Sequence, residues 1–226
     1  MNFDLEQNYF IMHKESRPSI LYFGTPVVVI STLNEDGSFN LAPMSSVFWL
    51  GWRCVIGLGS SSKTAQNLIR SKECVLNLPS VYDVAAVDRL ALTTGANPVP
   101  PVKQLRGYRF DPNKFRTAGL TPMASELVDP PAVREFPVQM EAKLAAHHPL
   151  GEDDDATKGR LISFELKILR VQLEESIVMD GHPNRIDPDK WRPLIMSFQH
   201  FYGLGRKVYP STLASIPEKM YEMNSR

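Results

Sequence analysis

The chain has 226 residues, enough to bury a substantial core, and length alone leaves open one generous domain or two small ones. Hydrophobic residues make up 43% and charged residues 22% of the sequence, which is typical of a soluble globular protein. Lysine plus arginine equals aspartate plus glutamate at 25 each, so no global electrostatic field favours binding to nucleic acid or to an anionic membrane.

The amino-terminal stretch 1–18 has an early aspartate and glutamate and no long apolar core, which argues against a secretory signal. No stretch approaches the ~20 apolar residues that a membrane span requires. Cys54 and Cys74 lie in separate strand-like runs. A disulfide between neighbouring strands is conceivable, but two reduced core thiols in a cytoplasmic protein are favoured.

The first predicted elements are short strands separated by turns. The run 27–32 (VVVIST) is β-branched and apolar, which is typical of a strand buried on both faces. NEDG at 34–37 predicts a turn, and the next strand is expected to break at Pro43, which cannot donate to a ladder. Three further strands are predicted from the runs SVFWLG (46–51), RCVIGLG (53–59) and CVLNL (74–78).

Two helices are expected in this half of the chain, over 63–71 and 81–91. In the first, Ala65, Leu68 and Ile69 recur at the spacing of one buried face, and Ser62 can cap its start. The stretch 93–115 that follows the second helix is rich in proline and turn residues, and it is too long for a simple connector. We expect it to be a lid or a segment that contacts a partner.

The second half returns to strands. A strand is predicted over 136–148, followed by the acidic loop 151–156. The apolar set of 160–175 changes face by one residue between Ile168 and Leu169, which requires a β-bulge and suits a sheet that curls into a barrel. A terminal helix is expected over 215–221. Without an internal repeat or a break in composition, we expect a single domain.

The stretch Gly59–Leu68 (GSSSKTAQNL) brings several hydroxyls and an ammonium to the start of the first helix. Helix N-termini carry unpaired N–H groups and partial positive charge, so they bind anions readily. With Lys63, Thr64 and Asn67 on one flank of the helix, the residues fit a phosphate monoester. The alternative is a serine-capped surface helix with a solvated lysine. The glycine spacing matches neither a dinucleotide fingerprint nor a P-loop.

The neighbouring stretch NLAPMSSVFWLG (40–51) places a proline-interrupted backbone beside Met44, Phe48 and Trp49. Free backbone donors next to apolar walls suit a planar heterocycle with ring nitrogens and carbonyls. A strand bulge packed by core aromatics explains the same residues equally well.

Taken together, these stretches resemble the flavin reductase-like family of FMN-binding split barrels. The similarity is carried by PVVVISTLNEDGSFNLAPMSS, by SSSKTAQNLIRSKECVLNLPS, by AGLTPMASELVDPPAVREFPVQMEAKL and by the closing segment IDPDKWRPLIMSFQHFYGLGR. It covers roughly residues 20–210, with the order and spacing of the motifs as its strongest feature.

The resemblance implies a mostly β fold with a few helices, a six-stranded antiparallel FMN-binding split barrel, usually dimeric, with FMN near the subunit interface. It implies a ring-edge segment of Ala42, Pro43, Met44, Ser45 and Ser46, a group of Ser61, Ser62, Lys63, Thr64 and Asn67 around the phosphate and ribityl chain, and a late approach to the flavin by His200 and Tyr202. The family often has Arg or His in the phosphate loop. Here serines occupy those places and Lys63 is the only cation of the loop.

Other constellations are weaker. His147 and His148 are adjacent on a predicted strand and point to opposite faces, so they are poorly placed to share a metal ion with the acidic run at 152–155. His182 is expected in a turn. No Gly-x-Ser-x-Gly elbow occurs, and the two cysteines suggest no nucleophile pair. We predict no metal site and assign no catalytic residue.

The expected function is that of an NAD(P)H-dependent flavin reductase, in which NADH or NADPH delivers hydride to the flavin without a side-chain acid–base pair. A homodimer is expected, and a small-molecule substrate or a partner monooxygenase is compatible with it. Two alternatives remain open: a non-catalytic FMN carrier or redox sensor, and a flavoenzyme that acts on its own small substrate beneath the 92–115 segment.

Overall fold

Seven strands pair into one antiparallel sheet in the computed structural model, which describes residues 11–221. The order across the sheet is β3-β2-β6-β11-β12-β5-β4, so β3 and β4 are its edges. The strands are β2 (Val28–Leu33), β3 (Phe39–Met44), β4 (Val47–Leu50), β5 (Arg53–Gly59), β6 (Glu73–Leu78), β11 (Val138–Leu150) and β12 (Leu161–Leu173). The class expected from the sequence is confirmed, with seven strands in the main sheet rather than six.

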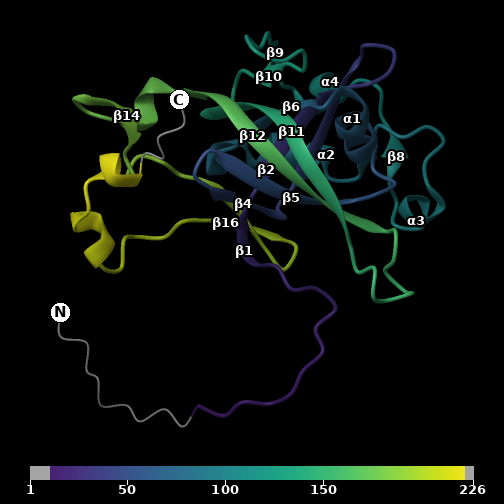
Figure 1. Ribbon diagram of the computed structural model, residues 1–226, viewed down its shortest axis with the longest axis horizontal. Helices are drawn as coiled ribbons and strands as arrows, with labels where there is room; N and C mark the ends of the chain where they lie inside the picture. The colour runs from purple at the N-terminus through teal and green to yellow at the C-terminus, as the bar shows by residue number, and fades with distance from the viewer. Residues whose placement is uncertain (1–10, 222–226) are drawn as a thin grey trace.

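The apolar run 27–32 is buried on both faces because two core clusters meet across β2. Val28 and Ile30 belong to the larger cluster, together with both cysteines. Val27 and Val29 belong to a second cluster with Leu41 and the apolar sides of two helices, α2 (Val84–Leu90) and α4 (Lys114–Ala118). In Figure 1 these helices and α1 (Lys63–Ser71) lie together at one end of the sheet.

The predicted β-bulge is present. Opposite β11, Glu141 pairs with Arg170 and Ala142 pairs with Ile168, so Leu169 is the extra residue of β12. A second register shift lies between Leu144 and Ala146 of β11. Bulges bend strands and increase their twist, which is how these two long strands curl across the sheet (Figure 1).

A smaller sheet carries the last predicted site residues. Its order is β1-β15-β16, with β1 (Phe23–Pro26), β15 (Leu194–Ser197) and β16 (His200–Gly203). The remaining short elements are β7 (Thr93–Thr94), α3 (Pro101–Gln104), β8 (Arg109–Phe110), β9 (Pro122–Met123), β10 (Ala132–Val133), β13 (Val178–Met179), β14 (His182–Ile186), and the 3-10 turns η1 (Val81–Asp83), η2 (Glu175–Ile177), η3 (Thr212–Ser215) and η4 (Glu218–Tyr221).

Three local expectations are wrong. Pro43 does not break its strand: β3 continues to Met44, because an edge strand leaves one side of its backbone unpaired and so tolerates proline. The terminal helix over 215–221 is replaced by the two 3-10 turns η3 and η4, which Pro217 separates. His182 begins β14 and pairs with Met179 instead of lying in the turn.

Both cysteines are free and buried, as the sequence predicts. Burial raises the pKa of the Cys54 thiol to about 12 and raises that of Cys74 as well. Neither thiol is therefore available as a thiolate. No helix in residues 11–221 is long and apolar enough to span a membrane.

Candidate functional site

The start of α1 is an open donor site. The Ser62 side chain accepts a hydrogen bond from the Ala65 N–H at 3.2 Å, which confirms the predicted cap. The Ser62 N–H donates to Gly59 O in the preceding turn. Among the described residues, the N–H groups of Lys63 and Thr64 donate to no protein oxygen. Two oriented donors and the positive end of a nine-residue helix thus face the loop.

The serines of this loop have different roles. Ser60 fixes the loop to the base of the β11–β12 hairpin: its hydroxyl donates to Gly159 O at 2.8 Å and its N–H to Arg160 O at 3.0 Å. Ser62 caps the helix. Ser61 is exposed, and its hydroxyl makes no hydrogen bond within residues 11–221. Ser61 is therefore the hydroxyl of this loop that is free to meet a ligand.

Lys63 is held by a carboxylate that the sequence analysis did not identify. Its Nζ lies 2.5 Å from Glu35 Oε2, in the turn between β2 and β3. The Lys63 side chain is 16% exposed and that of Glu35 is 58% exposed. The hydrogen bond from Lys63 is the main reason that the pKa of Glu35 is lowered, so Glu35 is an anion at neutral pH. An incoming anion would compete with it.

The helical spacing predicted that Lys63, Thr64 and Asn67 share one flank of the helix, and this prediction is wrong. Thr64 and Asn67 are buried and face the sheet, whereas Ile69, expected in the core, is 37% exposed. The buried face is rotated toward the polar ends of β2 and β3, where Asn67 Nδ2 donates to Thr32 Oγ1 and to Asn34 Oδ1, each at 3.0 Å. Asn67 Oδ1 has no partner within residues 11–221.

Asn40 links this helix start to the sheet and to α4. Its Nδ2 donates to Thr64 Oγ1 at 3.1 Å and to Thr32 Oγ1 at 3.2 Å. Its Oδ1 accepts from Lys114 Nζ at 3.0 Å. Lys114 also donates to Leu41 O at 2.7 Å, although only 3% of the residue is exposed. A buried network of neutral oxygens therefore surrounds one ammonium beneath the loop.

The proline-rich stretch expected to be a lid or partner contact is folded, and it lies against the same network. β7 and β8 pair in parallel, with α3 between them. At Gly95 the backbone comes so close that a Cβ would lie 2.5 Å from Asn40 Oδ1 and 3.1 Å from Lys63 Cγ. Only glycine permits that approach. Residues 93–118 thus flank the start of α1.

The segment Ala42–Ser46 runs from the end of β3 into β4. Ser45 is buried, and the other four residues are partly exposed. Ser46 O accepts from the Gly57 N–H at 2.9 Å, which joins the segment to β5, the strand that leads into the serine loop. Gly57 lies two residues before the end of β5 at Gly59, and the turn that contains Ser60 and Ser61 follows directly. One elongated ligand could reach both segments.

Phe48 and Trp49, the aromatic side chains expected beside this segment, differ in their exposure to solvent. Phe48 is 52% exposed, whereas Trp49 is partly buried and packs against the larger core. Trp49 lines an apolar hollow of about 350 Å³ together with Trp191 and Pro193, and its indole N–H has no partner among the described residues. Trp49 therefore belongs to the core end of the barrel rather than to the surface around Ser46.

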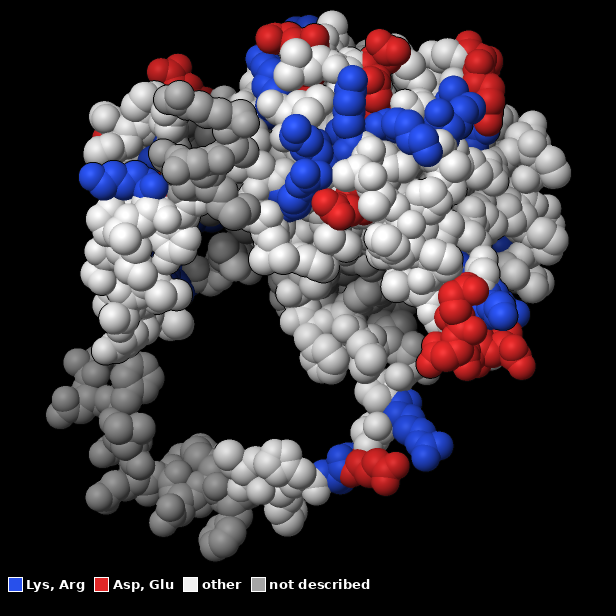
Figure 2. Space-filling view, viewed as in Figure 1, with Lys and Arg blue, Asp and Glu red and all other residues white. Residues whose placement is uncertain are grey.

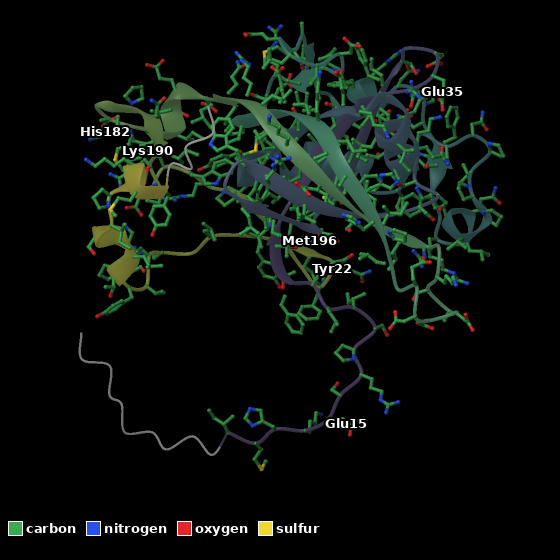
Figure 3. The ribbon with its side chains drawn as sticks, viewed as in Figure 1. Glu15, Tyr22, Glu35, His182, Lys190 and Met196 are labelled. Atoms are coloured by element: carbon green, nitrogen blue, oxygen red, sulfur yellow. The ribbon has the colours of Figure 1, made fainter. Side chains whose placement is uncertain are left out.

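His200 and Tyr202 lie on β16 and are exposed. Their hairpin reaches the Ser46 region through Tyr22: Tyr22 O accepts from the Phe198 N–H at 3.0 Å, and Ser46 Oγ lies 3.5 Å from Tyr22 Oη. Figure 3 shows Tyr22 on the lower side of the body, near Met196 of β15, and Glu35 at the upper right. The predicted residues thus fall into two groups, one around α1 and one around Tyr22.

The remaining candidates form no site. His147 stacks on Phe164 with ring centroids 6.0 Å apart. The acidic run 152–155 is exposed, as expected. Within residues 11–221, no three His, Cys, Asp or Glu side chains gather in a way that could hold a metal ion.

Glu35, Asn40, Gly95, Lys114 and Tyr22 were missed by sequence reasoning. The signal for Glu35 was its place in the predicted turn, opposite the only cation of the loop. For Lys114 there was no local signal, since a lysine that opens a short helix is usually solvated. Its burial depends on the packing of α4 against β3, where Asn40 lies 74 residues earlier in the chain.

Comparisons with known proteins agree with this arrangement. Residues 20–204 match the family model described as "Flavin reductase like domain". An uncharacterized protein of Bacillus subtilis, YdfE, is 40% identical over 195 residues, which are 86% of this chain and 91% of YdfE.

Two solved structures show the same fold. Flavoredoxin of Desulfovibrio vulgaris has a TM-score of 0.71 at 22% identity and covers 90% of this chain and 99% of its own. Nitrilotriacetate monooxygenase component B from Bacillus cereus has a TM-score of 0.66 at 22% identity and covers 85% of this chain and 89% of its own. At these identities the likeness concerns the fold alone: a mostly β split barrel with a few helices.

Proposed function

Because the chain belongs to the flavin reductase-like family, we propose that it is an FMN-binding oxidoreductase that accepts hydride from NADH or NADPH. The observation that carries the proposal is the start of α1, where two N–H donors without protein acceptors lie beside a lysine and an exposed serine hydroxyl. These groups suit a terminal phosphate, the feature that distinguishes FMN from riboflavin.

In this proposal the phosphate lies at Ser61, Ser62 and Lys63. The Lys63 and Thr64 N–H groups and the Ser61 hydroxyl donate to it, and Lys63 supplies a charge-assisted hydrogen bond in place of its bond to Glu35. Thr64 and Asn67 support the site from below, because their side chains are engaged with β2 and β3. They are thus assigned to fixing the helix start, not to direct contact with the phosphate.

We assign the flavin ring to the surface along Ala42, Pro43, Met44, Ser45 and Ser46, with His200 and Tyr202 approaching from the small sheet. Bound FMN would supply a ring that takes up hydride from a stacked nicotinamide. The chain's own contribution is to hold the two rings in contact and to exclude water. No acid–base side chain is assigned to the step.

We also propose a single-domain chain that functions as a homodimer. Exposed apolar side chains lie on β1, β4 and β16, including Phe23 (72% exposed) and Leu50 (68%), and others lie separately on the segment 204–221, including Tyr209 (80%). Figure 2 shows few charged side chains on the lower part of the body, where β1 and β16 lie. An apolar surface of this extent is typical of an interface. Phe48 is exposed and fits this view, whereas Trp49 is already partly covered by its own core.

A partner enzyme is a further part of the proposal. The Bacillus cereus relative is described as component B of a monooxygenase. A reductase of that kind would hand reduced flavin to a second enzyme, and a small-molecule acceptor is the other possibility.

The test compares FMN with riboflavin in Lys63→Ala, by quenching of flavin fluorescence. A charge-assisted hydrogen bond is worth roughly 1.5–3 kcal/mol, so FMN affinity should fall about ten- to a hundred-fold, while riboflavin affinity should stay the same. Arg70→Ala, at the other end of α1, is the matched control and should leave both unchanged. Equal binding of FMN and riboflavin by the wild-type protein would contradict the phosphate assignment.

Anaerobic stopped-flow mixing with NADH and with NADPH tests the reaction. Rapid bleaching of bound flavin by either nicotinamide is expected. Bound flavin that neither one reduces would replace the reductase with an FMN carrier or redox sensor. Reduction only in the presence of an additional small substrate would indicate a flavoenzyme acting on that substrate.

A further inference from the structure

Lys114 is a buried cation that the proposed function does not use. It opens α4, and 3% of the residue is exposed. Its Nζ donates to Asn40 Oδ1 at 3.0 Å and to Leu41 O at 2.7 Å, and no carboxylate among residues 11–221 lies within ion-pair distance. A buried ammonium without a counter-ion is costly, so its presence calls for a compensating role.

Its surroundings lead directly to the start of α1. Asn40 accepts from Lys114 with its oxygen and donates with its nitrogen to Thr64 Oγ1 at 3.1 Å. Thr64 is the second residue of α1, and its N–H is one of the two free donors. Gly95 closes the other side, against Asn40 and Lys63. The Asn40 side chain alone therefore connects Lys114 to the helix start. Lys114, Asn40 and Thr64 are all buried, so water screens the charge of Lys114 only weakly.

We propose that Lys114 is a positioning residue of the flavin site: through Asn40 it fixes Thr64 at the start of α1, and its buried positive charge strengthens binding of the FMN phosphate there. This inference rests on the proposed function, because it takes the phosphate to lie at α1. It explains why Lys114 is held by neutral oxygens alone. The bound phosphate supplies the missing negative charge.

The charges around Lys114 support this reading. Burial, and to a smaller extent the nearby Lys103, lower the pKa of Lys114 to about 7, while Asp111 acts in the opposite direction. The strand it reaches, β3, contains no ionisable residue. From α2, Arg89 donates to Ala118 O, and from the start of α1, Lys63 is paired with Glu35. An anion at α1 should therefore favour the charged form of Lys114.

The inference is tested by flavin affinity against pH in the wild-type protein. Above pH 7 the FMN phosphate is a dianion, since its second pKa is about 6, so its own titration does not contribute. From pH 7 to 9, FMN affinity should fall about five- to ten-fold as Lys114 loses its proton, because a charge at this range in a poorly screened site is worth about ten-fold. Riboflavin affinity should stay constant.

Two variants separate the role of the charge from that of the fold. Lys114→Met should bind FMN about five- to ten-fold more weakly than the wild type at pH 7, with no pH dependence from 7 to 9 and unchanged riboflavin binding. Lys114→Gln keeps a donor for Asn40 and remains informative if the methionine variant does not fold. It should also lose the pH dependence. Lys167→Met, at an exposed position of β12, removes the same charge and is the control.

The outcomes are distinguishable. If wild type prefers FMN and Lys114→Gln keeps both that preference and its pH profile, the role of Lys114 is overturned and the phosphate site stands. Equal loss of both flavins in the variants would also overturn it, by showing a purely structural role. If wild type does not prefer FMN at all, the proposed function fails, and the inference fails with it.

Discussion

The two groups of candidate residues occupy regions of opposite character. Around α1, polar side chains are buried and connected: Asn40, Thr64 and Lys114 satisfy one another beneath the serine loop. In the region of Tyr22, apolar side chains are exposed, as with Phe23 on β1 and Phe48 on β4. The hydrogen bonds that connect the first region all lie within one chain. The second lacks the packing that a folded protein normally gives such side chains.

This difference indicates where one chain is sufficient and where it is not. A buried polar network needs every member, because each unpaired group costs free energy. The α1 region should thus keep its shape whether or not the protein assembles. The Tyr22 region gains its order from whatever covers it, and we propose that a second copy does so. A flavin that spans both regions would bind fully only in the assembled protein.

The largest expected effect comes from the connected region. Asn40→Ala removes the partner of Lys114 and of Thr64, so the free energy of unfolding should fall by about 2–4 kcal/mol. Phe48→Ala, in the exposed region, should change the stability of the monomer by less than about 0.5 kcal/mol. Urea denaturation at a concentration where the protein is monomeric measures both. Similar losses in the two variants would contradict the contrast between the regions.

A charge in the exposed region tests assembly. Phe48→Asp should weaken dimerisation by about 2 kcal/mol, or roughly thirty-fold, because it would bury an unpaired carboxylate in the interface. Analytical ultracentrifugation at micromolar concentration with FMN present should give a dimer for the wild type and mostly monomer for the variant. Val102→Asp, on exposed α3, is the control. A wild-type protein that is only monomeric under these conditions would rule out the proposed assembly.

Local patterns predicted the elements well where neighbours in sequence decide the structure. The first helix begins and ends where its cap and periodicity place it, and the phase change at Ile168 located the bulge at Leu169. Two of the failures have a common cause. Whether Pro43 is tolerated within its strand, and whether Thr64 is buried, depends on which strands are neighbours in the sheet. A single sequence does not give the order of strands in a sheet.

The site was predicted in part for the same reason. The serine loop and its helix are contiguous in sequence, so their donors could be recognised together. Part of the buried face of α1 is polar, because Thr64 and Asn67 form hydrogen bonds with Asn40 of β3 and Thr32 of β2. Helical spacing alone does not show which strands a helix packs against, so this face was not predicted. Lys114 is 74 residues from Asn40, and only the folded chain brings them together.

The smallest expected effect concerns the ion pair at the edge of the connected region. Glu35 holds Lys63 in the unliganded protein and places a negative charge beside the proposed phosphate. The pair is partly exposed, and such pairs are worth about 0.2–1 kcal/mol, so Glu35→Gln should strengthen FMN binding by about 1.4- to five-fold. Riboflavin binding should not change, because riboflavin lacks the phosphate that Lys63 is proposed to bind.

Asp36→Asn, the neighbouring carboxylate, is the matched control, since it bonds to Ser38 rather than to Lys63. Titration by flavin fluorescence at low salt gives the largest signal, and added salt should reduce the difference. Weaker FMN binding in Glu35→Gln would mean that the carboxylate orients Lys63 toward the ligand instead of competing for it. In that case Glu35 would be part of the site, and the connected region would extend to the surface of the β2–β3 turn.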